Sequence, residues 1–283
     1  MMLKIVLIAL IIYIVVVTRA KIRLPHPGMQ ATVDVLKAAD LKDAEVVAMA
    51  REYIAYSDRN NSVAPADDPC ARRLETLTDR YVSVNGVKLN FKVYKTSQIN
   101  AFATADGSVR VFSGLMERLS DDELMAIIGH EMGHIRHRDT LGAIRKAYLT
   151  SAARNMLGAA GGIVGSLSGS QLGSIAEKLA SSQFSQKQEF AADDFSFGFL
   201  LRNGYDPFAM ATALEKIDTI AGGGGSASAE IARLFATHPD SLRRAARMRA
   251  RAEAHCRRIG QGEKPAAETP EIPEKPGNPE TPV

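Results

Sequence analysis

Two histidines and a glutamate form the segment of this sequence whose spacing most clearly predicts chemistry. They are His130, Glu131 and His134, in the order His-Glu-Met-Gly-His. Histidines four positions apart project from one face of a helix, so both imidazoles can reach a single zinc ion. A glutamate beside the first histidine can take a proton from a water bound to that metal. The motif, HExxH, therefore predicts a zinc site that activates water.

The segment that carries this motif has the pattern of a buried helix. Ser120 and Glu123 have the spacing of a capping box, which starts a helix by satisfying free backbone N–H groups. The apolar residues that follow recur at helical spacing, at Leu124, Ile127, Ile128 and Ile135. Because such a helix places its histidines and glutamate against a protein core, zinc binding explains the motif better than chance.

A third metal ligand must come from elsewhere in the chain, since a catalytic zinc has three protein ligands and a water. The metzincin extension of the motif is absent, because Thr140 stands where its last histidine would be. The best candidate is Glu189, on a second predicted helix that ends near Asn203. Asp193 follows four residues later on the same face, so one carboxylate can bind zinc while the other orients a ligating histidine.

Four motifs in this order resemble the gluzincin zinc peptidases of the HtpX and BepA type. They are the strand pair at 100–115, the HExxH motif, Glu-x-x-x-Asp at 189–193, and Thr-His-Pro at 237–239 with an arginine six residues after the histidine. The resemblance covers about residues 74–248. It implies an α+β fold, in which a mainly helical zincin-like metallopeptidase domain has a small β-sheet before the HExxH helix.

The resemblance also assigns roles position by position. His130, His134 and Glu189 would bind one zinc ion per chain. Glu131 would act as the general acid and base. Asp193 would be the carboxylate that orients a zinc ligand.

The late motif contributes His238 and Arg244. They resemble the pair that stabilises the negative oxygen formed when a peptide carbonyl is attacked. In some relatives the histidine instead moves onto the zinc and keeps the enzyme inactive. Both interpretations of His238 are open at this point.

Short strands are predicted before the zinc helix. The Asn85-Gly86 pair predicts a hairpin turn. The next strands resemble the family at Asn100, Ala101 and Phe102. A strand at the sheet edge beside the zinc could bind an extended substrate by backbone pairing. We therefore expect cleavage of unstructured segments with loose side-chain preference.

The N-terminal segment is strongly apolar. Lys4 precedes thirteen apolar residues at 5–17. A helix of that length is about 20 Å long, shorter than the roughly 30 Å of a bilayer core. This length suits a signal peptide, whereas the charged flank that follows is a poor cleavage site. Residues 1–23 are thus predicted to be either a signal peptide or an uncleaved anchor that contacts the membrane.

Two cysteines, Cys70 and Cys256, lie on opposite sides of the predicted catalytic region. A single pair in an exported domain suggests a disulfide, and two unrelated buried thiols are the alternative. Together with the apolar leader, the pair favours the bacterial cell envelope. The protein would be periplasmic, or anchored in the membrane and facing the periplasm.

The peptidase domain is predicted at 24–260, with its active-site core at 74–248. Within it, a Gly-rich segment at about 150–182 predicts a lid or a helical hairpin over the cleft. Residues 261–283 predict a disordered tail rich in proline and glutamate. The net charge of +3 is nearly balanced and gives no case for nucleic acid binding.

These features together predict a zinc-dependent endopeptidase that hydrolyses unfolded or misfolded proteins. The substrate class is implied by the resemblance alone. The alternative is a chaperone-like proteostasis factor that binds client proteins and keeps its zinc site latent.

Overall fold

The computed structural model describes residues 41–155, 169–180, 183–222, 234 and 237–262. The helices are α3 (Asp43–Asn60), α4 (Pro69–Thr78), α5 (Ser113–Met116), α6 (Asp121–Arg136), α7 (Asp139–Asn155), α8 (Gly169–Ala180), α9 (Gln186–Arg202), α10 (Ala209–Gly222) and α12 (Ser241–Gly260). The strands are β1 (Ser83–Val84), β2 (Val87–Lys88), β3 (Asn90–Tyr94), β4 (Ala101–Ala103) and β5 (Ser108–Phe112). This confirms the predicted α+β class, mainly helical with a small sheet before the HExxH helix.

The strands form two small sheets. One has the order β3-β5-β4, with β3 parallel and β4 antiparallel to the central strand, so β4 lies at an edge. The other is a hairpin of β1 and β2, whose turn residues Asn85 and Gly86 have φ values of 49° and 75°. Asn-Gly pairs favour this positive φ in tight turns, and the predicted hairpin is confirmed.

Helices α6 and α9 pack directly against each other because two glycines of α6 permit a close approach. A Cβ atom on Gly133 would lie 2.9 Å from the Cα of Ala192, and one on Gly129 would lie 2.9 Å from a ring carbon of Phe199. Close packing leaves no room for such contacts. The glycine inside the HExxH motif is therefore a packing requirement, and it brings this helix against the one that carries Glu189.

Both helices start with a capping box. At the start of α6, the Ser120 hydroxyl accepts from the Glu123 backbone N–H, and the Glu123 carboxylate accepts from the Ser120 N–H at 2.9 Å. At the start of α9, Ser185 and Gln188 make the equivalent pair of bonds. Each box satisfies backbone donors that the first turn of a helix leaves free. The starting points of both site helices are thus determined by local sequence.

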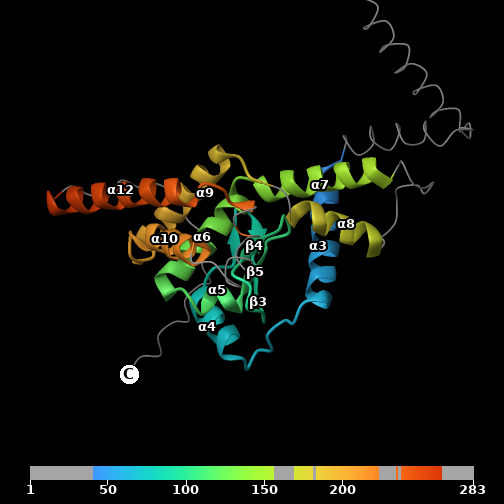
Figure 1. The fold of residues 1–283 in the computed structure, drawn as a ribbon, viewed down its shortest axis with the longest axis horizontal. Helices are drawn as coiled ribbons and strands as arrows, with labels where there is room; N and C mark the ends of the chain where they lie inside the picture. Colours follow the sequence, from blue (N-terminus) through green and yellow to red (C-terminus); the bar gives the residue numbers. More distant parts are fainter. Residues whose placement is uncertain (1–40, 156–168, 181–182, 223–233, 235–236, 263–283) are drawn as a thin grey trace, which may run out of the picture.

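Helix α6 occupies the centre of the described fold. It contacts β4, α7, α9 and α10. In Figure 1, α10 and α12 lie to the left of the strands, and α3, α7 and α8 lie to the right. Each of these groups is held together by its own packing, α10 against α12 and α3 against both α7 and α8. The zinc motif is therefore enclosed between two groups of helices and the sheet.

Some predictions concern residues that the structure does not describe. The signal peptide or anchor at 1–23 lies outside the described residues, as do 263–283 of the tail and 156–168 of the Gly-rich segment. The parts of the Gly-rich segment that are described belong to α7 and α8, which pack together. Within the described ranges, no helix combines the length and the hydropathy needed to cross a membrane.

The predicted disulfide is not confirmed. Cys70 and Cys256 are free thiols, the first in the opening turn of α4 and the second exposed near the end of α12. Figure 1 shows α4 below the sheet, whereas α12 extends away to the left. A disulfide requires Cα atoms within about 7 Å of each other. Two lone cysteines in a sequence carry no information about that distance.

Candidate metal centre

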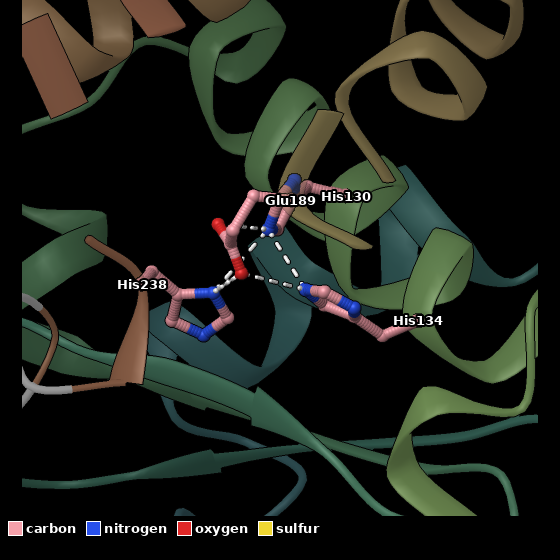
Figure 2. A group of neighbouring side chains, drawn as sticks. All are labelled: His130, His134, Glu189 and His238. Atoms are coloured by element: carbon pink, nitrogen blue, oxygen red, sulfur yellow. Dashed lines mark hydrogen bonds and ion pairs between the residues drawn. The ribbon is translucent and has the colours of Figure 1, made fainter. Parts of the chain in front are cut away.

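Four buried side chains converge on one point (Figure 2): His130 and His134 of α6, Glu189 of α9, and His238. One ligand atom of each lies within 4.8 Å of the others. The two Nε2 atoms of His130 and His134 are 3.1 Å apart. The Glu189 carboxylate oxygens lie 3.4 Å from His134 Nε2 and 3.5 Å from His130 Nε2. The structure therefore brings together the three predicted zinc ligands.

The other nitrogen of each imidazole faces a carboxylate. His130 Nδ1 lies 2.9 Å from Asp193, and His134 Nδ1 lies 3.0 Å from Asp139. An imidazole whose Nδ1–H donates to a carboxylate carries a free lone pair on Nε2 when it is neutral. Two such lone pairs would face each other across 3.1 Å, so a proton or a metal ion must lie between them.

The electrostatics of the site favour a cation. Burial lowers the pKa of His134, but hydrogen bonds to Asp139 and Glu189 outweigh burial and raise that pKa to about 9. Burial and the charge of Arg244 lower the pKa of His130 to about 3, which keeps this ring neutral. Ligands about 2.0–2.1 Å from a tetrahedral zinc lie about 3.3 Å apart. The spacing and the donor types both fit zinc, which would take the place of the His134 proton.

Glu131 lies beside this cluster and is also buried. Burial raises the pKa of its carboxyl group, although the nearby histidines and the backbone N–H of Ala103 oppose the shift. A carboxyl group with a raised pKa can exchange a proton near neutral pH more readily than an exposed one. The structure thus places Glu131 in a setting that suits acid–base chemistry.

His238 completes the cluster from the segment before α12. Its Nδ1 lies 3.1 Å from Glu189 and its Nε2 lies 3.6 Å from Glu131. Figure 2 shows its ring directed at the same point as the two other histidines. This position is compatible with both interpretations of His238, oxyanion stabilisation and metal ligation, and both stay predictions.

Arg244 is buried behind the cluster. Its guanidinium donates to both oxygens of Asp193 and forms an ion pair of 2.5 Å with Glu189. The arginines around it in the sequence suggest a solvated helix face, but only 2% of Arg244 is exposed. Arg244 therefore contacts the carboxylates of the site directly, while its role in stabilising an oxyanion stays a prediction.

Asp139 is a site residue that the sequence analysis missed. It starts α7, three residues after the end of α6, and its carboxylate accepts from His134 while also accepting from Gln188. The two helices are joined through Arg138, whose φ is 65°. The sequence signal for this contact was a carboxylate five positions after the second histidine. Whether Asp139 reaches His134 depends, however, on the left-handed turn at Arg138.

Phe184 is a second residue that was missed. Its ring stacks on His134, with centroids 4.0 Å apart and an angle of 18° between the planes. It comes just before the capping box of α9. An isolated phenylalanine in a loop carries no pattern that identifies such a contact. Stacking restricts the ring orientation of His134 and shields it from water.

The predicted substrate residues Asn100, Ala101 and Phe102 line a cavity of about 230 Å³ together with Glu131 and His238. At the two ends of β4, the carbonyl of Asn100 and the N–H of Thr104 bond to β5. Peptide groups alternate in direction along a strand. Those of Ala101 and Ala103 are therefore directed to the free edge of the sheet, toward the HExxH helix.

A comparison with protein families matches residues 70–252 of the chain to the model described as Peptidase family M48. These residues include every member of the cluster, Glu131, and the carboxylates that orient the histidines.

Known proteins of Escherichia coli strain K12 are similar to the chain. Metalloprotease LoiP is 40% identical over 222 residues, which make up 78% of this chain and 86% of that protein. Metalloprotease YcaL is 37% identical over 216 residues, 76% of this chain and 83% of that protein. The Beta-barrel assembly-enhancing protease is 32% identical over 178 residues, 59% of this chain and 36% of that protein.

Proposed function

Because the chain belongs to peptidase family M48 and is a zinc-dependent metalloendopeptidase, we propose that it hydrolyses unfolded or misfolded proteins of the bacterial cell envelope. The observation that carries this proposal is the position of the His130, His134 and Glu189 cluster beside the free edge of β4. A metal site next to an unpaired strand edge suits a substrate that is itself extended.

We assign the chemical roles as follows. His130, His134 and Glu189 hold the zinc, which when bound lowers the pKa of a water and polarises the substrate carbonyl. Glu131 takes a proton from the attacking water and passes it to the nitrogen of the departing amine. Asp139 and Asp193 hold the two imidazoles in the tautomer that leaves each Nε2 free for the metal.

His238 donates to the negative oxygen of the tetrahedral intermediate in this proposal. Its ring lies near both Glu131 and Glu189, at the rim of the site where a peptide carbonyl would enter. A donor in a buried setting stabilises developing charge more strongly than it would in water. Arg244 supports the site through Asp193 and Glu189 rather than through the substrate.

Substrate selection follows from the edge of β4. The peptide groups of Ala101 and the carbonyl of Ala103 can pair with the backbone of a bound segment, which requires that segment to be free of its own secondary structure. Unfolded and misfolded proteins offer such segments. The location in the cell envelope rests on the apolar residues 5–17 and on the similarity to a protease named for β-barrel assembly.

The first test is cleavage of unfolded casein by the full chain and by the Glu131→Gln variant, each with chelator and then with added zinc. Loss of the general base is expected to lower kcat about 10²–10⁴-fold without removing zinc. Chelator should abolish wild-type cleavage and zinc should restore it. Cleavage that is equal in both proteins, or that survives the chelator, would contradict the assignment.

A second function is favoured by one observation, the closeness of His238 to the three ligands. If this ring binds the zinc as a fourth ligand, no position is left for the attacking water and the metal site is latent. The chain would then bind client proteins without cleaving them. Wild-type protein that contains zinc, binds casein and leaves it intact would support this alternative. Glu131→Gln would then protect a client from aggregation as well as the wild type does.

A further inference from the structure

Gln188 connects the two helices that flank the zinc motif. It lies in the first turn of α9, one residue before the proposed zinc ligand Glu189, and its side chain reaches the start of α7. There its Nε2 donates to Oδ1 of Asp139 at 2.7 Å. The other oxygen of this carboxylate, Oδ2, lies 3.0 Å from Nδ1 of the proposed ligand His134. A single carboxylate therefore separates Gln188 from His134.

The two ends of the Gln188 amide meet partners of opposite kinds. Its Oε1 accepts from the backbone N–H of Ser185 at 2.9 Å and from the Ser185 hydroxyl at 2.7 Å. A backbone N–H can only donate, and an ionised carboxylate can only accept. A reversed amide would place a donor against the N–H of Ser185 and an acceptor against Asp139. The neighbours of Gln188 thus determine which end of its amide faces the site.

The capping box of α9 does not explain why this residue is a glutamine. The box uses only Oε1, and a glutamate at the same position of a helix completes it equally well. The start of α6 has such a glutamate, Glu123. The contact with Asp139 requires an N–H donor, which an ionised glutamate lacks. The amide group of Gln188 is therefore explained by Asp139.

The start of α9 also holds the other side of the His134 ring. Phe184 stacks on this ring with centroids 4.0 Å apart, while Gln188 fixes the carboxylate to which the ring donates. The same segment continues into Glu189. Helix α6 packs against both α7 and α9, so Gln188 links the first turns of its two neighbours. The position of His134 relative to Glu189 thus depends on contacts made by this segment.

We propose that Gln188 is a positioning residue which, through Asp139, sets His134 and Glu189 at the spacing that one zinc ion requires. It rests on the zinc site of the proposed function and adds a residue that does not contact the metal. Zinc ligands must lie within about 2.0–2.2 Å of the ion, so a displaced imidazole weakens binding. A negative charge at position 188 should displace it, because two carboxylates would then face each other, although α9 would keep its cap.

The first test measures zinc affinity of the full chain by competition with a fluorescent chelator. Gln188→Glu should raise the zinc dissociation constant about 10–100-fold, the effect typical of contacts that orient a ligand. The matched control is Gln186→Glu, in the same turn of α9. Gln186 donates to the exposed carboxylate of Asp240 at 3.0 Å, so the control places the same charge against a different carboxylate. It should bind zinc as the wild type does.

A second variant restores the hydrogen bond with its direction reversed. When Asp139→Asn is combined with Gln188→Glu, the new amide at 139 can accept from His134 and donate to the new carboxylate at 188. The zinc dissociation constant of the double variant should be no higher than that of Asp139→Asn alone. It should thus lie about tenfold or more below the product of the two single effects. A role limited to the cap of α9 would give effects that multiply.

The visible absorption of cobalt(II), bound in place of zinc, reports the arrangement of the ligands without any need for activity. At saturating cobalt, Gln188→Glu should change this spectrum, because the imidazole of His134 no longer approaches the metal in the same orientation. Gln186→Glu should give the wild-type spectrum. A spectrum of Gln188→Glu identical to that of the wild type would contradict the positioning role.

Unchanged zinc affinity in Gln188→Glu would overturn the proposal, as would single effects that multiply in the double variant. If Gln188→Glu does not fold, the double variant still decides when it is compared with Asp139→Asn, and zinc binding about tenfold weaker than in that variant would overturn the proposal. The expected pattern of affinities in a protein that leaves casein intact would support the role of Gln188 and contradict the proposed function alone. Zinc affinity that His134→Ala does not change would overturn both the metal site and the proposal.

Discussion

Arg244 and Asp193 form a buried pair in which the guanidinium donates to both carboxylate oxygens, from Nε at 2.9 Å and from Nη2 at 2.7 Å. Asp193 in turn accepts from the Nδ1 of His130. His130 on α6, a proposed zinc ligand, therefore faces a carboxylate on α9, which is itself held by an arginine on α12. The chain must fold over its whole catalytic region before this ligand is in place.

This relationship predicts a large loss of stability in Arg244→Ala. The substitution leaves Asp193 and Glu189 buried without their cation, and breaking such a pair costs about 3–5 kcal/mol. The measurement is denaturant unfolding of the zinc-free protein. Arg247→Ala is the matched control on the same helix, because its pair with Asp194 is partly exposed and is worth about 1 kcal/mol or less. Equal losses in the two variants would contradict the buried role.

Asp139 provides a prediction about metal affinity. Asp139→Asn removes the negative charge that faces His134 Nδ1, so the zinc dissociation constant should rise about 10–100-fold. Competition with a fluorescent chelator measures this directly and does not require activity. Asp67→Asn, at an exposed position before α4, should bind zinc as the wild type does. An unchanged affinity in Asp139→Asn would show that this contact does not orient the ligand.

His238→Ala distinguishes the two roles left open for this residue. As an oxyanion donor, its loss should lower kcat about 10²–10³-fold while one zinc per chain remains bound. Peptide kinetics and metal analysis of the same preparation provide both values. A rise in kcat would instead identify His238 as the ligand that keeps the site latent.

The sequence was sufficient to predict three of the four side chains that converge in the buried cluster. His130, His134 and Glu189 share the chemistry of zinc ligands and lie on helices whose caps and apolar spacing are local signals. The hairpin at Asn85 and Gly86 followed from turn chemistry in the same way. Features that depend on residues a few positions apart were predicted because local geometry determines them.

Features that depend on long-range contacts could not be predicted. Asp139 reaches His134 only through the left-handed turn at Arg138. The burial of Arg244 required knowledge of which face of α12 meets α9, and neighbouring arginines obscured it. Helix α3 is attached to the sheet through Asp58, which pairs with an arginine 52 residues away. No local sequence pattern predicts such pairings.

The pairing of Asp58 with Arg110 also predicts how stability depends on pH. Burial alone would raise the pKa of Asp58, but hydrogen bonds from Arg110, Lys92 and Tyr94 outweigh it and lower the pKa from 3.8 to about 2. A carboxyl group whose pKa is lower in the folded state stabilises the fold above its unfolded pKa and loses that effect as the pH falls. The contribution is thus complete above about pH 5 and declines toward pH 2.

Asp58→Asn should therefore lower the free energy of unfolding at pH 7 by about 1–2 kcal/mol, less than the full value of a pKa difference of nearly two units because solvent screens this partly exposed carboxylate. The difference between wild type and variant should shrink as the pH is lowered from 5 toward 2, because the wild-type carboxyl group then takes up a proton. Urea unfolding at a series of pH values measures it, with Asp67→Asn as the exposed control. A difference that stays constant with pH would show that the charge of Asp58 does not hold α3 on the sheet. Helix α3 would then be held in place by its packing against α7 and α8.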